Sequence, residues 1–426
     1  MSNILLKNVT IVAADSPLNG RQKDILINAQ GIIENIGDDL PFNSKKDKLF
    51  DKPGTCVSIG WMDIGAHFGD PGFEYREDLE SLNEAAMAGG FTKIAPFPNT
   101  SPVIQSRADI YYVQNKTRDL LVDVLPIGAL SVGCKGKDLA ELVDMYTSGA
   151  VAFSDGNYSV QDAGLMMRGL QYAKIFDGLI INTPADTSIA PGGQIHEGLI
   201  SVQLGLTGIP AIAETLMIER DLTLLAYADS RLHIYALTTS EAVDAIRLAK
   251  KSGLNISASV TALHLAFTDD ALADFDTQYK VFPPLRDAGH ITALKKGLID
   301  GTIDFITSQH TPIDADCKHL EFPEAEFGII NLETAISLSY EHLKDILSLE
   351  KFIDLWTIQP RKTLRTLIPK IAIGEKADLT LFNPNVDWKY ETKNIRSKSK
   401  NSPLIGKNLP LKIEGVINKG KSHFNE

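Results

Sequence analysis

Side chains suited to metal binding and proton transfer follow several strand-like runs of this sequence. His67 lies at the end of the first such run, Asp155 follows the fourth, and Gln309 and His310 follow the last. Imidazole and carboxylate groups are the usual oxygen and nitrogen ligands of zinc, and they also transfer protons in catalysis. Alternate residues of a strand face the same side, so positions 65 and 67 point the same way. A metal site there would need a histidine at both positions, but the first is Gly65.

The sequence contains eight strand-like runs that could position these residues. The strand-like runs cover residues 57–68, 91–97, 123–129, 150–154, 178–183, 231–237, 255–261 and 303–308. Stretches between them, such as 240–250, have apolar residues at helical spacing. This alternation predicts an α/β fold, a (β/α)8 TIM barrel, over residues 57–368, with its chemistry at the C-terminal ends of the strands. A doubly wound sheet is the competing architecture, but the G-x-G-x-x-G turn typical of it is absent after the first strand.

The two ends of the chain have a different pattern from the middle. Residues 1–56 and 369–426 contain short β-branched runs separated by turn residues, which favour strands and hairpins. We therefore expect a small β-sandwich domain formed by both termini. The polar stretch 393–402 within the second part is predicted to be a mobile surface loop.

Composition excludes several classes of function. The 426 residues carry a formal net charge of -12, which disfavours nucleic acid and anionic membranes as partners. No apolar run reaches the ~18 residues of a membrane span, and the N-terminus does not resemble a signal peptide. Three cysteines without C-x-x-C spacing are typical of a reducing compartment, so we expect a cytoplasmic protein.

Short motifs occur in a characteristic order along the chain. They are Asp70-Pro71-Gly72, Ala88-Gly89-Gly90-Phe91-Thr92, 98–103 (PNTSPV), 150–155 (AVAFSD), Gly208-Ile209-Pro210-Ala211, 280–286 (KVFPPLR), 300–304 (DGTID) and 331–335 (NLETA). With them the sequence resembles dihydroorotases, of the cyclic amidohydrolase branch of the amidohydrolase superfamily, over nearly the whole chain. The resemblance implies a barrel flanked by a β-sandwich. It also implies reversible ring closure of carbamoyl aspartate to dihydroorotate in pyrimidine biosynthesis, with one or two zinc ions.

The metal ligands that this resemblance implies are mostly missing. The family pattern has His-x-His after the first strand, a carboxylate after the fourth, a histidine after the fifth and sixth, and an aspartate after the eighth. Two of these six are kept, as His67 and Asp155. The other four positions hold Gly65, Thr183, Ala236 and Gln309.

The substrate contacts implied by the resemblance are depleted in the same way. Asn99 is kept as a substrate-binding residue, whereas the arginine expected after His-x-His is Gly69. Phe282 stands where an asparagine is expected, and Ile313 where a histidine is expected. Gly69 removes the bidentate guanidinium that would bind a carboxylate.

Two ligands are too few for zinc, which takes three or four. We therefore expect no metal cofactor, with His67 and Asp155 as remnants of the site. Gln309 occupies the position of the catalytic aspartate, and its neutral amide cannot transfer a proton as a carboxylate does. The sequence favours a non-catalytic dihydroorotase homologue that acts as a structural or regulatory partner. By analogy at the level of the family alone, its partner would be aspartate transcarbamoylase, and the chain itself would form a homo-oligomer, as a dimer.

Two alternatives stay open. In the first, the chain is an active dihydroorotase or related cyclic amidohydrolase, with one zinc ion held by His67, Asp155 and His310. In the second, it is a sensor that binds a small molecule without converting it, in a pocket made more apolar by Phe282 and Ile313.

Other polar residues are expected to be structural. Asp63 is predicted to be a buried polar anchor, and His233 and His264 are predicted to be barrel histidines. Cys317 has no base placed beside it in the sequence, so we expect an unreactive thiol.

Overall fold

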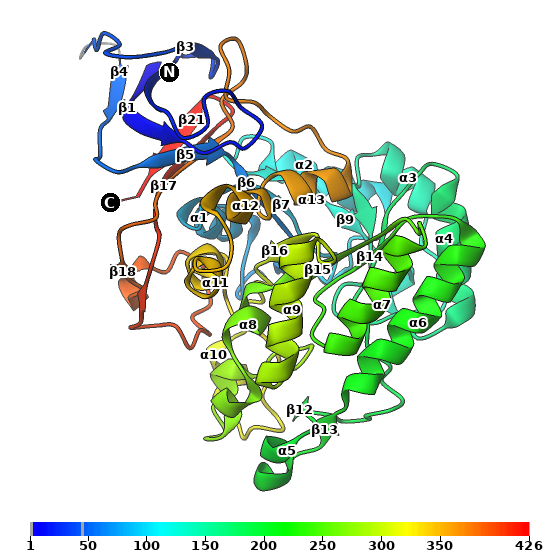
Figure 1. Ribbon diagram of the computed structural model, residues 1–426. Helices are drawn as coiled ribbons and strands as arrows, with labels where there is room; N and C mark the ends of the chain where they lie inside the picture. Colours follow the sequence, from blue (N-terminus) through cyan, green and yellow to red (C-terminus); the bar gives the residue numbers. More distant parts are fainter. Residues whose placement is uncertain (1–2, 44–46, 426) are drawn as a thin grey trace.

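The central region of the computed structural model, which describes residues 3–43 and 47–425, is a curled sheet of parallel strands (Figure 1). Its strands are β6 (Trp61–Ile64), β7 (Phe91–Ala95), β8 (Asp123–Val124), β9 (Ile127–Gly128), β10 (Ala152–Phe153), β11 (Ile180–Asn182), β14 (Leu232–Ile234), β15 (Ile256–Thr261) and β16 (Phe305–Thr307). Backbone hydrogen bonds join them in two sets, β6-β7-β8 and β9-β10-β11-β14-β15-β16, and within each set every strand pairs in parallel with its neighbour in chain order. The run predicted at 123–129 is divided, since β8 pairs with β7 and β9 with β10.

The first and last strands of this sheet meet through side chains. Thr307 Oγ1 donates a hydrogen bond to Asp63 Oδ1 over 3.0 Å, and the Ser308 backbone N–H donates to the same oxygen over 2.7 Å. Asp63 is thus the buried polar anchor that the sequence predicts. Among the described strands, no ladder of backbone hydrogen bonds joins β16 to β6. The structure therefore supports a mixed α/β fold with a curled parallel sheet, and the closed barrel stays a prediction.

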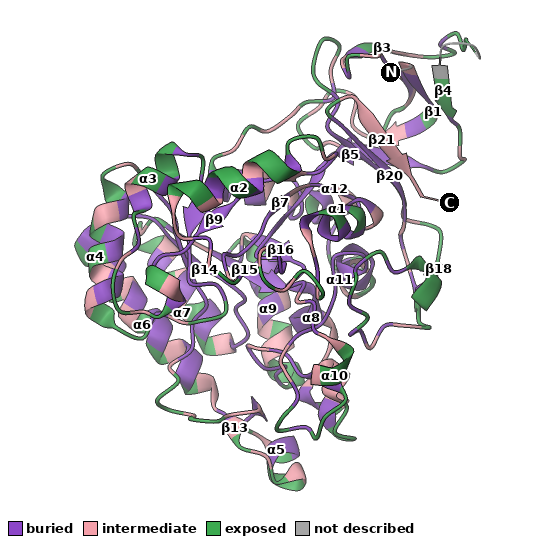
Figure 2. Ribbon diagram, turned by 180° about the vertical axis from the view of Figure 1, so that it is seen from behind, coloured by how far each residue is buried: buried purple, intermediate pink, exposed green. Residues whose placement is uncertain are grey.

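The helices lie around the curled sheet, most of them on its outer face, and α5 (Leu199–Leu204) projects away from the sheet at the bottom of Figure 1. They are α1 (Leu79–Ala88), α2 (Arg107–Thr117), α3 (Leu142–Thr147), α4 (Ala163–Lys174), α5 (Leu199–Leu204), α6 (Ala211–Ala228), α7 (Ser240–Lys251), α8 (Ala262–Ala266), α9 (Ala288–Asp300), α10 (Ala315–Lys318), α11 (Ala335–Leu343), α12 (Leu349–Asp354) and α13 (Ile358–Leu364). Figure 2 shows the central strands buried and the exposed residues on the outer helices. None of the described helices is long and apolar enough to cross a membrane.

Helix α7 illustrates how the sequence forms these elements. The Thr239 side chain caps its start by accepting a hydrogen bond from Ala242 N, which satisfies one of the free N–H groups there. Val243 and Ile246 lie on its buried face, and two lysines in the last turn suit the negative end of the helix dipole. The helix predicted at 240–250 is confirmed.

The two ends of the chain form one mixed sheet, as the sequence predicts. Its strands are β1 (Asn3–Ile11), β2 (Gln22–Ile27), β3 (Ile33–Gly37), β4 (Asp47–Phe50), β5 (Cys56–Ile59), β17 (Leu379–Asn383), β20 (Lys412–Asn418) and β21 (Lys421–Phe424). Two short pairs lie apart from it, β12 (Ile195–His196) with β13 (Gly208–Ile209), and β18 (Trp388–Lys389) with β19 (Asn408–Leu409). The two-layered sandwich and the domain limits stay predictions.

The single strand predicted over 57–68 is two strands in different sheets. β5 pairs with β1 and β17 in the terminal sheet, and β6 begins the central sheet immediately after Gly60. A Cβ atom on Gly60 would lie 2.0 Å from both Asp378 Oδ1 and Thr92 Oγ1. Only glycine fits where the chain passes from one sheet to the other.

Residues 393–402 form a surface loop, as predicted, but about half of its side chains are buried, and its mobility stays a prediction. The side chains of Ser397, Ser399 and Asn401 are buried. Asn401 accepts a hydrogen bond from Ile313 N over 3.1 Å and donates to the backbone carbonyls of residues 311 and 328. The segment is polar because its short side chains form hydrogen bonds with backbone groups of other loops. Composition alone does not distinguish such buried polar side chains from polar side chains exposed to solvent.

Candidate functional site

The ring of Tyr235 fills the space beside Gly65 at the end of the first central strand. Gly65 has φ +92°, and a Cβ atom on it would lie 2.4 Å from Tyr235 Cε2. Tyr235 Oη donates a hydrogen bond to the Gly65 carbonyl over 3.2 Å, and its ring packs edge-on against Phe97. A side chain at position 65 would therefore require the Tyr235 ring to move. Sequence reasoning missed Tyr235, whose only signal was an aromatic residue directly before Ala236 at a strand end.

His67 is buried beside this pair. Burial lowers the pKa of its imidazole to about 4, with a smaller contribution from His310, so the ring is neutral at pH 7. The ring lies against Phe97, with centroids 5.3 Å apart, and the Asn157 side chain forms a hydrogen bond with it. A neutral imidazole is the form that binds a metal, so its protonation state fits the role of a ligand.

The carboxylate of Asp155 is engaged by the loop that follows β9. Its Oδ1 accepts a hydrogen bond from Ser131 N over 2.8 Å, and its Oδ2 accepts one from Ser131 Oγ. Burial raises the pKa of this carboxyl, and the bonds from Ser131 partly offset that effect. Asn99, the predicted substrate contact, donates from Nδ2 to the Asp155 backbone carbonyl over 3.0 Å. Both predicted residues therefore support loops at the strand ends.

The fifth and sixth strand ends carry no metal ligand. Thr183 donates from Oγ1 to the Gly156 carbonyl over 2.7 Å, and Ala236 has a left-handed backbone with φ +58°. Gln309 follows the eighth strand and donates from Nε2 to the Phe282 carbonyl over 2.7 Å. Its Oε1 is buried and, within the described part of the chain, accepts no hydrogen bond.

His310 is held in one tautomer by backbone donors. Its Nδ1 accepts hydrogen bonds from the N–H groups of Asn331 and Leu332, over 3.1 and 3.3 Å. The proton of the neutral ring is therefore on Nε2, which lies 3.4 Å from Glu77 Oε2. A protonated Nε2 near a carboxylate does not offer a lone pair to a metal.

A narrow pocket of about 340 Å³ lies over these strand ends. Gln309, Asn157, Phe282 and Phe327 are among its lining residues, and the two phenyl rings pack edge-on with centroids 5.9 Å apart. Phe282 adds an apolar ring to a lining that also includes polar residues such as Gln309 and Glu326. Ile313 is buried outside this lining.

One group of three side chains in residues 3–43 and 47–425 has the spacing of metal ligands, and it is not the predicted one. His196, Asp287 and His290 offer ligand atoms within 4.8 Å of one another. However, His196 Nδ1 accepts from Arg286 Nη1 over 2.9 Å, and His290 Nδ1 accepts from a backbone N–H over 3.0 Å. Both rings then carry their proton on Nε2, which faces Asp287 Oδ2. The distances of 3.6 and 3.9 Å fit an electrostatic contact with a shared carboxylate. They do not fit a metal site, because metal-bound imidazoles donate from the other nitrogen.

The remaining candidates have structural partners. Both ring nitrogens of His233 bond to serine hydroxyls, and His264 bonds to Thr261 Oγ1 and the Pro283 carbonyl. The pKa of the Cys317 thiol is raised, mainly by burial and then by Glu326, which disfavours the reactive thiolate.

Comparison with known proteins gives the family. Residues 54–242 match the model of the Dihydro-orotase-like family. The chain is 38% identical to the dihydroorotase of Caldicellulosiruptor saccharolyticus over 98% of this chain and 97% of that protein. It is 39% identical to that of Pelotomaculum thermopropionicum, over 95% of both. The chain belongs to the dihydroorotase-like family of cyclic amidohydrolases.

Solved structures agree on the fold. The L-hydantoinase (dihydropyrimidinase) of Arthrobacter aurescens superposes with a TM-score of 0.85 at 23% identity, covering 99% of this chain and 96% of that one. A dihydropyrimidinase of Brevibacillus agri gives 0.82 at 21% identity, covering 99% and 94%.

The residues at the strand ends do not fit the zinc ion that the resemblance to dihydroorotases implies. His67 has the right protonation state, but Asp155 is committed to Ser131, and His310 presents a protonated nitrogen. Tyr235 fills the place of another ligand. Zinc needs three or four donors converging on one point.

Proposed function

We propose that this member of the dihydroorotase-like family binds no zinc at its strand ends, is not catalytic there, and acts in the cytoplasm as a structural or regulatory partner in pyrimidine biosynthesis. The observation that carries the proposal is the overlap between Tyr235 and any side chain at position 65. Tyr235 also donates a hydrogen bond to the Gly65 carbonyl, which holds its ring in the space that a histidine ligand at position 65 would need. The amide of Gln309 supports the proposal, since it cannot accept and release a proton at neutral pH.

The partner that we propose is aspartate transcarbamoylase, and the chain itself would be a homo-oligomer. Exposed apolar side chains on two consecutive helices support a role in protein contacts. They are Leu199 and Val202 of α5, and Ile212 and Leu216 of α6. Exposed apolar residues gathered in one region mark interaction surfaces more often than scattered ones do.

Size-exclusion chromatography with light scattering, on the chain mixed with the transcarbamoylase of the same cell at micromolar concentration, tests this partner. The proposal predicts one co-eluting complex that is lost in Val202→Asp and kept in the control Ile175→Asp. Ile175 is as exposed as Val202 but lies in the turn after α4. Two separate peaks would remove the proposed partner.

Full-length similarity to proteins named dihydroorotase favours the alternative function, an active cyclic amidohydrolase. In that case His67, Asp155 and His310 would hold a single zinc ion. This would require His310 to give up its bonds to two backbone N–H groups, or Asp155 to leave Ser131. Measurement of zinc and turnover on one sample separates the two functions.

A further inference from the structure

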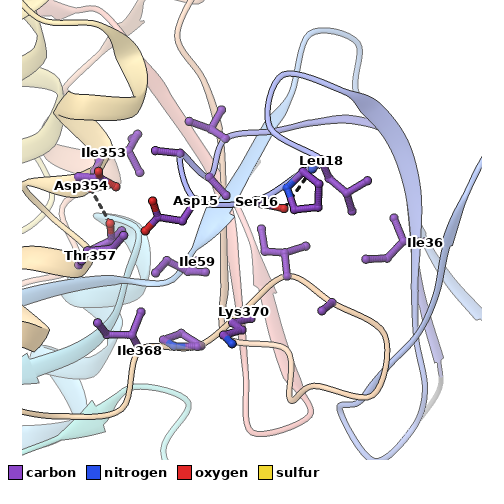
Figure 3. Close-up of a pocket in the computed structure, with 18 of the residues that line it drawn as sticks. Asp15, Ser16, Leu18, Ile36, Ile59, Ile353, Asp354, Thr357, Ile368 and Lys370 are labelled. Carbon is purple, nitrogen blue, oxygen red and sulfur yellow. Dashed lines mark hydrogen bonds between the residues drawn. The ribbon is translucent and has the colours of Figure 1, made fainter.

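A large apolar cavity lies between the terminal sheet and the last helices of the central region (Figure 3). Its volume is about 710 Å³, and its walls include Ile59, Ile353, Ile358, Ile368 and Ile371. Ile59 precedes β6, whereas His67 follows it, so the cavity is at the opposite end of the central strands from the pocket at Gln309. Cavities of roughly 300 to 1,000 Å³ with apolar walls and a few polar groups are typical of small-molecule sites.

Two carboxyl groups lie on one side of this cavity. Figure 3 shows the side chains of Asp15, from the turn after β1, and Asp354, at the end of α12, on the same side. Within residues 3–43 and 47–425, neither carboxyl group accepts a hydrogen bond or forms an ion pair. Asp354 also lies at a helix C-terminus, where the backbone carbonyls add negative charge. The apolar cavity therefore has a concentration of negative charge at one side.

The lysines near the cavity do not neutralise these carboxyl groups. Lys23 forms an ion pair with Asp38 over 2.7 Å. Lys370 is exposed and lies away from Asp354 in the view of Figure 3. Burial, reinforced by Asp15, raises the pKa of Asp354 to about 6, and Lys362 only partly opposes this. A cation brought into the cavity would relieve the repulsion between the two carboxylates.

We propose that this cavity binds an organic ammonium ion with an apolar body. The ammonium group contacts Asp15 and Asp354, and the hydrocarbon lies along the isoleucine walls. The site is separate from the strand-end pocket, so this proposal does not depend on the proposed loss of catalysis.

Isothermal titration of the full-length chain at pH 8 with hexylamine, 1-hexanol and hexanoate tests the proposal. The three probes share one hydrocarbon chain and differ in charge. We expect one hexylamine per chain, bound at least about tenfold tighter than hexanol, with hexanoate weakest. Equal affinity for hexylamine and hexanol, or no binding of either, would overturn the proposal.

Variants locate the ammonium group. Asp354→Asn and Asp15→Asn should each weaken hexylamine binding several-fold and leave hexanol binding unchanged. Asp345→Asn, which removes an exposed carboxylate outside the cavity, is the matched control. Since both lining carboxyls are partly or fully exposed, these variants should fold, and their melting temperatures would confirm it. Unchanged hexylamine affinity in both lining variants would contradict the assignment.

The pH dependence of hexylamine binding is an independent test of the proposal. The charged groups that act on Asp354 are Asp15, Glu350 and Lys362. Because burial, reinforced by Asp15, keeps the pKa of Asp354 near 6, hexylamine affinity should fall as the pH is lowered from 8 to 5, whereas hexanol affinity should not. A hexylamine affinity that is constant over this range would count against the carboxylates as its partners.

Discussion

Tyr235 and Gly65 form one packing unit at the strand ends, in which the ring of one residue occupies the space of a side chain on the other. The ring approaches to 2.4 Å of a Cβ atom built on Gly65, and its hydroxyl bonds to the Gly65 carbonyl. Gly65 also has φ +92°, which glycine adopts readily and other residues do not. A histidine restored at position 65 would therefore meet both a steric and a backbone penalty.

The first prediction concerns the stability of Gly65→Ala. Overpacking costs about 1–3 kcal/mol and left-handed strain about 1–2 kcal/mol, so we expect urea unfolding to show a loss of about 2–5 kcal/mol. Gly253→Ala is the control, because Gly253 has φ +84° and no atom near its Cβ position. It should lose only about 1–2 kcal/mol, from the backbone alone.

A double-mutant cycle separates the two contributions. In a Tyr235→Ala background, the steric part of the stability loss caused by Gly65→Ala should disappear. The double-mutant cycle should therefore give a coupling free energy of at least about 1 kcal/mol between the two positions. Strictly additive losses would mean that the ring does not restrict position 65.

The second prediction concerns the segment 391–404. Asn401→Ala should leave Ile313 N and two backbone carbonyls without their partner, with a loss of about 2–4 kcal/mol. Amide hydrogen exchange near residues 311–313 and 328–330 should become faster. The matched control is Asn394→Ala, since Asn394 is exposed and its side chain makes one long hydrogen bond of 3.5 Å. Equal effects of the two variants would show that the segment does not hold these loops.

Sequence patterns predicted the order and direction of the central strands because each strand leaves a local signal of apolar, β-branched residues. They also predicted the roles of Asp63 and His233, whose positions within strands imply burial. They failed where the decisive partner is distant in sequence. Tyr235 meets Gly65 across 170 positions, and Asn401 meets Ile313 across 88. The division of 57–68 at Gly60 depends on Asp378 and Thr92 in the same way.

The third prediction concerns pH. Burial raises the pKa of Asp63 to about 6, against the opposing hydrogen bonds from Ser308 and Thr307. Between its unfolded value near 4 and this folded value, the native state binds the proton more tightly. This contribution to stability is therefore fully present below pH ~4 and is lost as the pH rises through about 6.

Asp63→Asn removes this titration. The free energy of unfolding of the wild type relative to the variant should fall by on the order of 3 kcal/mol between pH 4 and pH 7. Urea unfolding of both proteins at each pH measures the difference, and their comparison cancels the titration of other buried carboxyls such as Glu333. A difference that is flat, or that grows with pH, would contradict the account of Asp63.

The most direct measurement is elemental analysis of zinc in the purified chain, with dihydroorotate hydrolysis assayed on the same sample before and after zinc is added. The dihydroorotase of Caldicellulosiruptor saccharolyticus, purified in parallel, is the reference. We predict zinc far below one ion per chain and no turnover above the uncatalysed rate, with or without added zinc. About one zinc ion per chain together with turnover would contradict the account, because Tyr235, Asp155 and His310 would then have to rearrange into a working site.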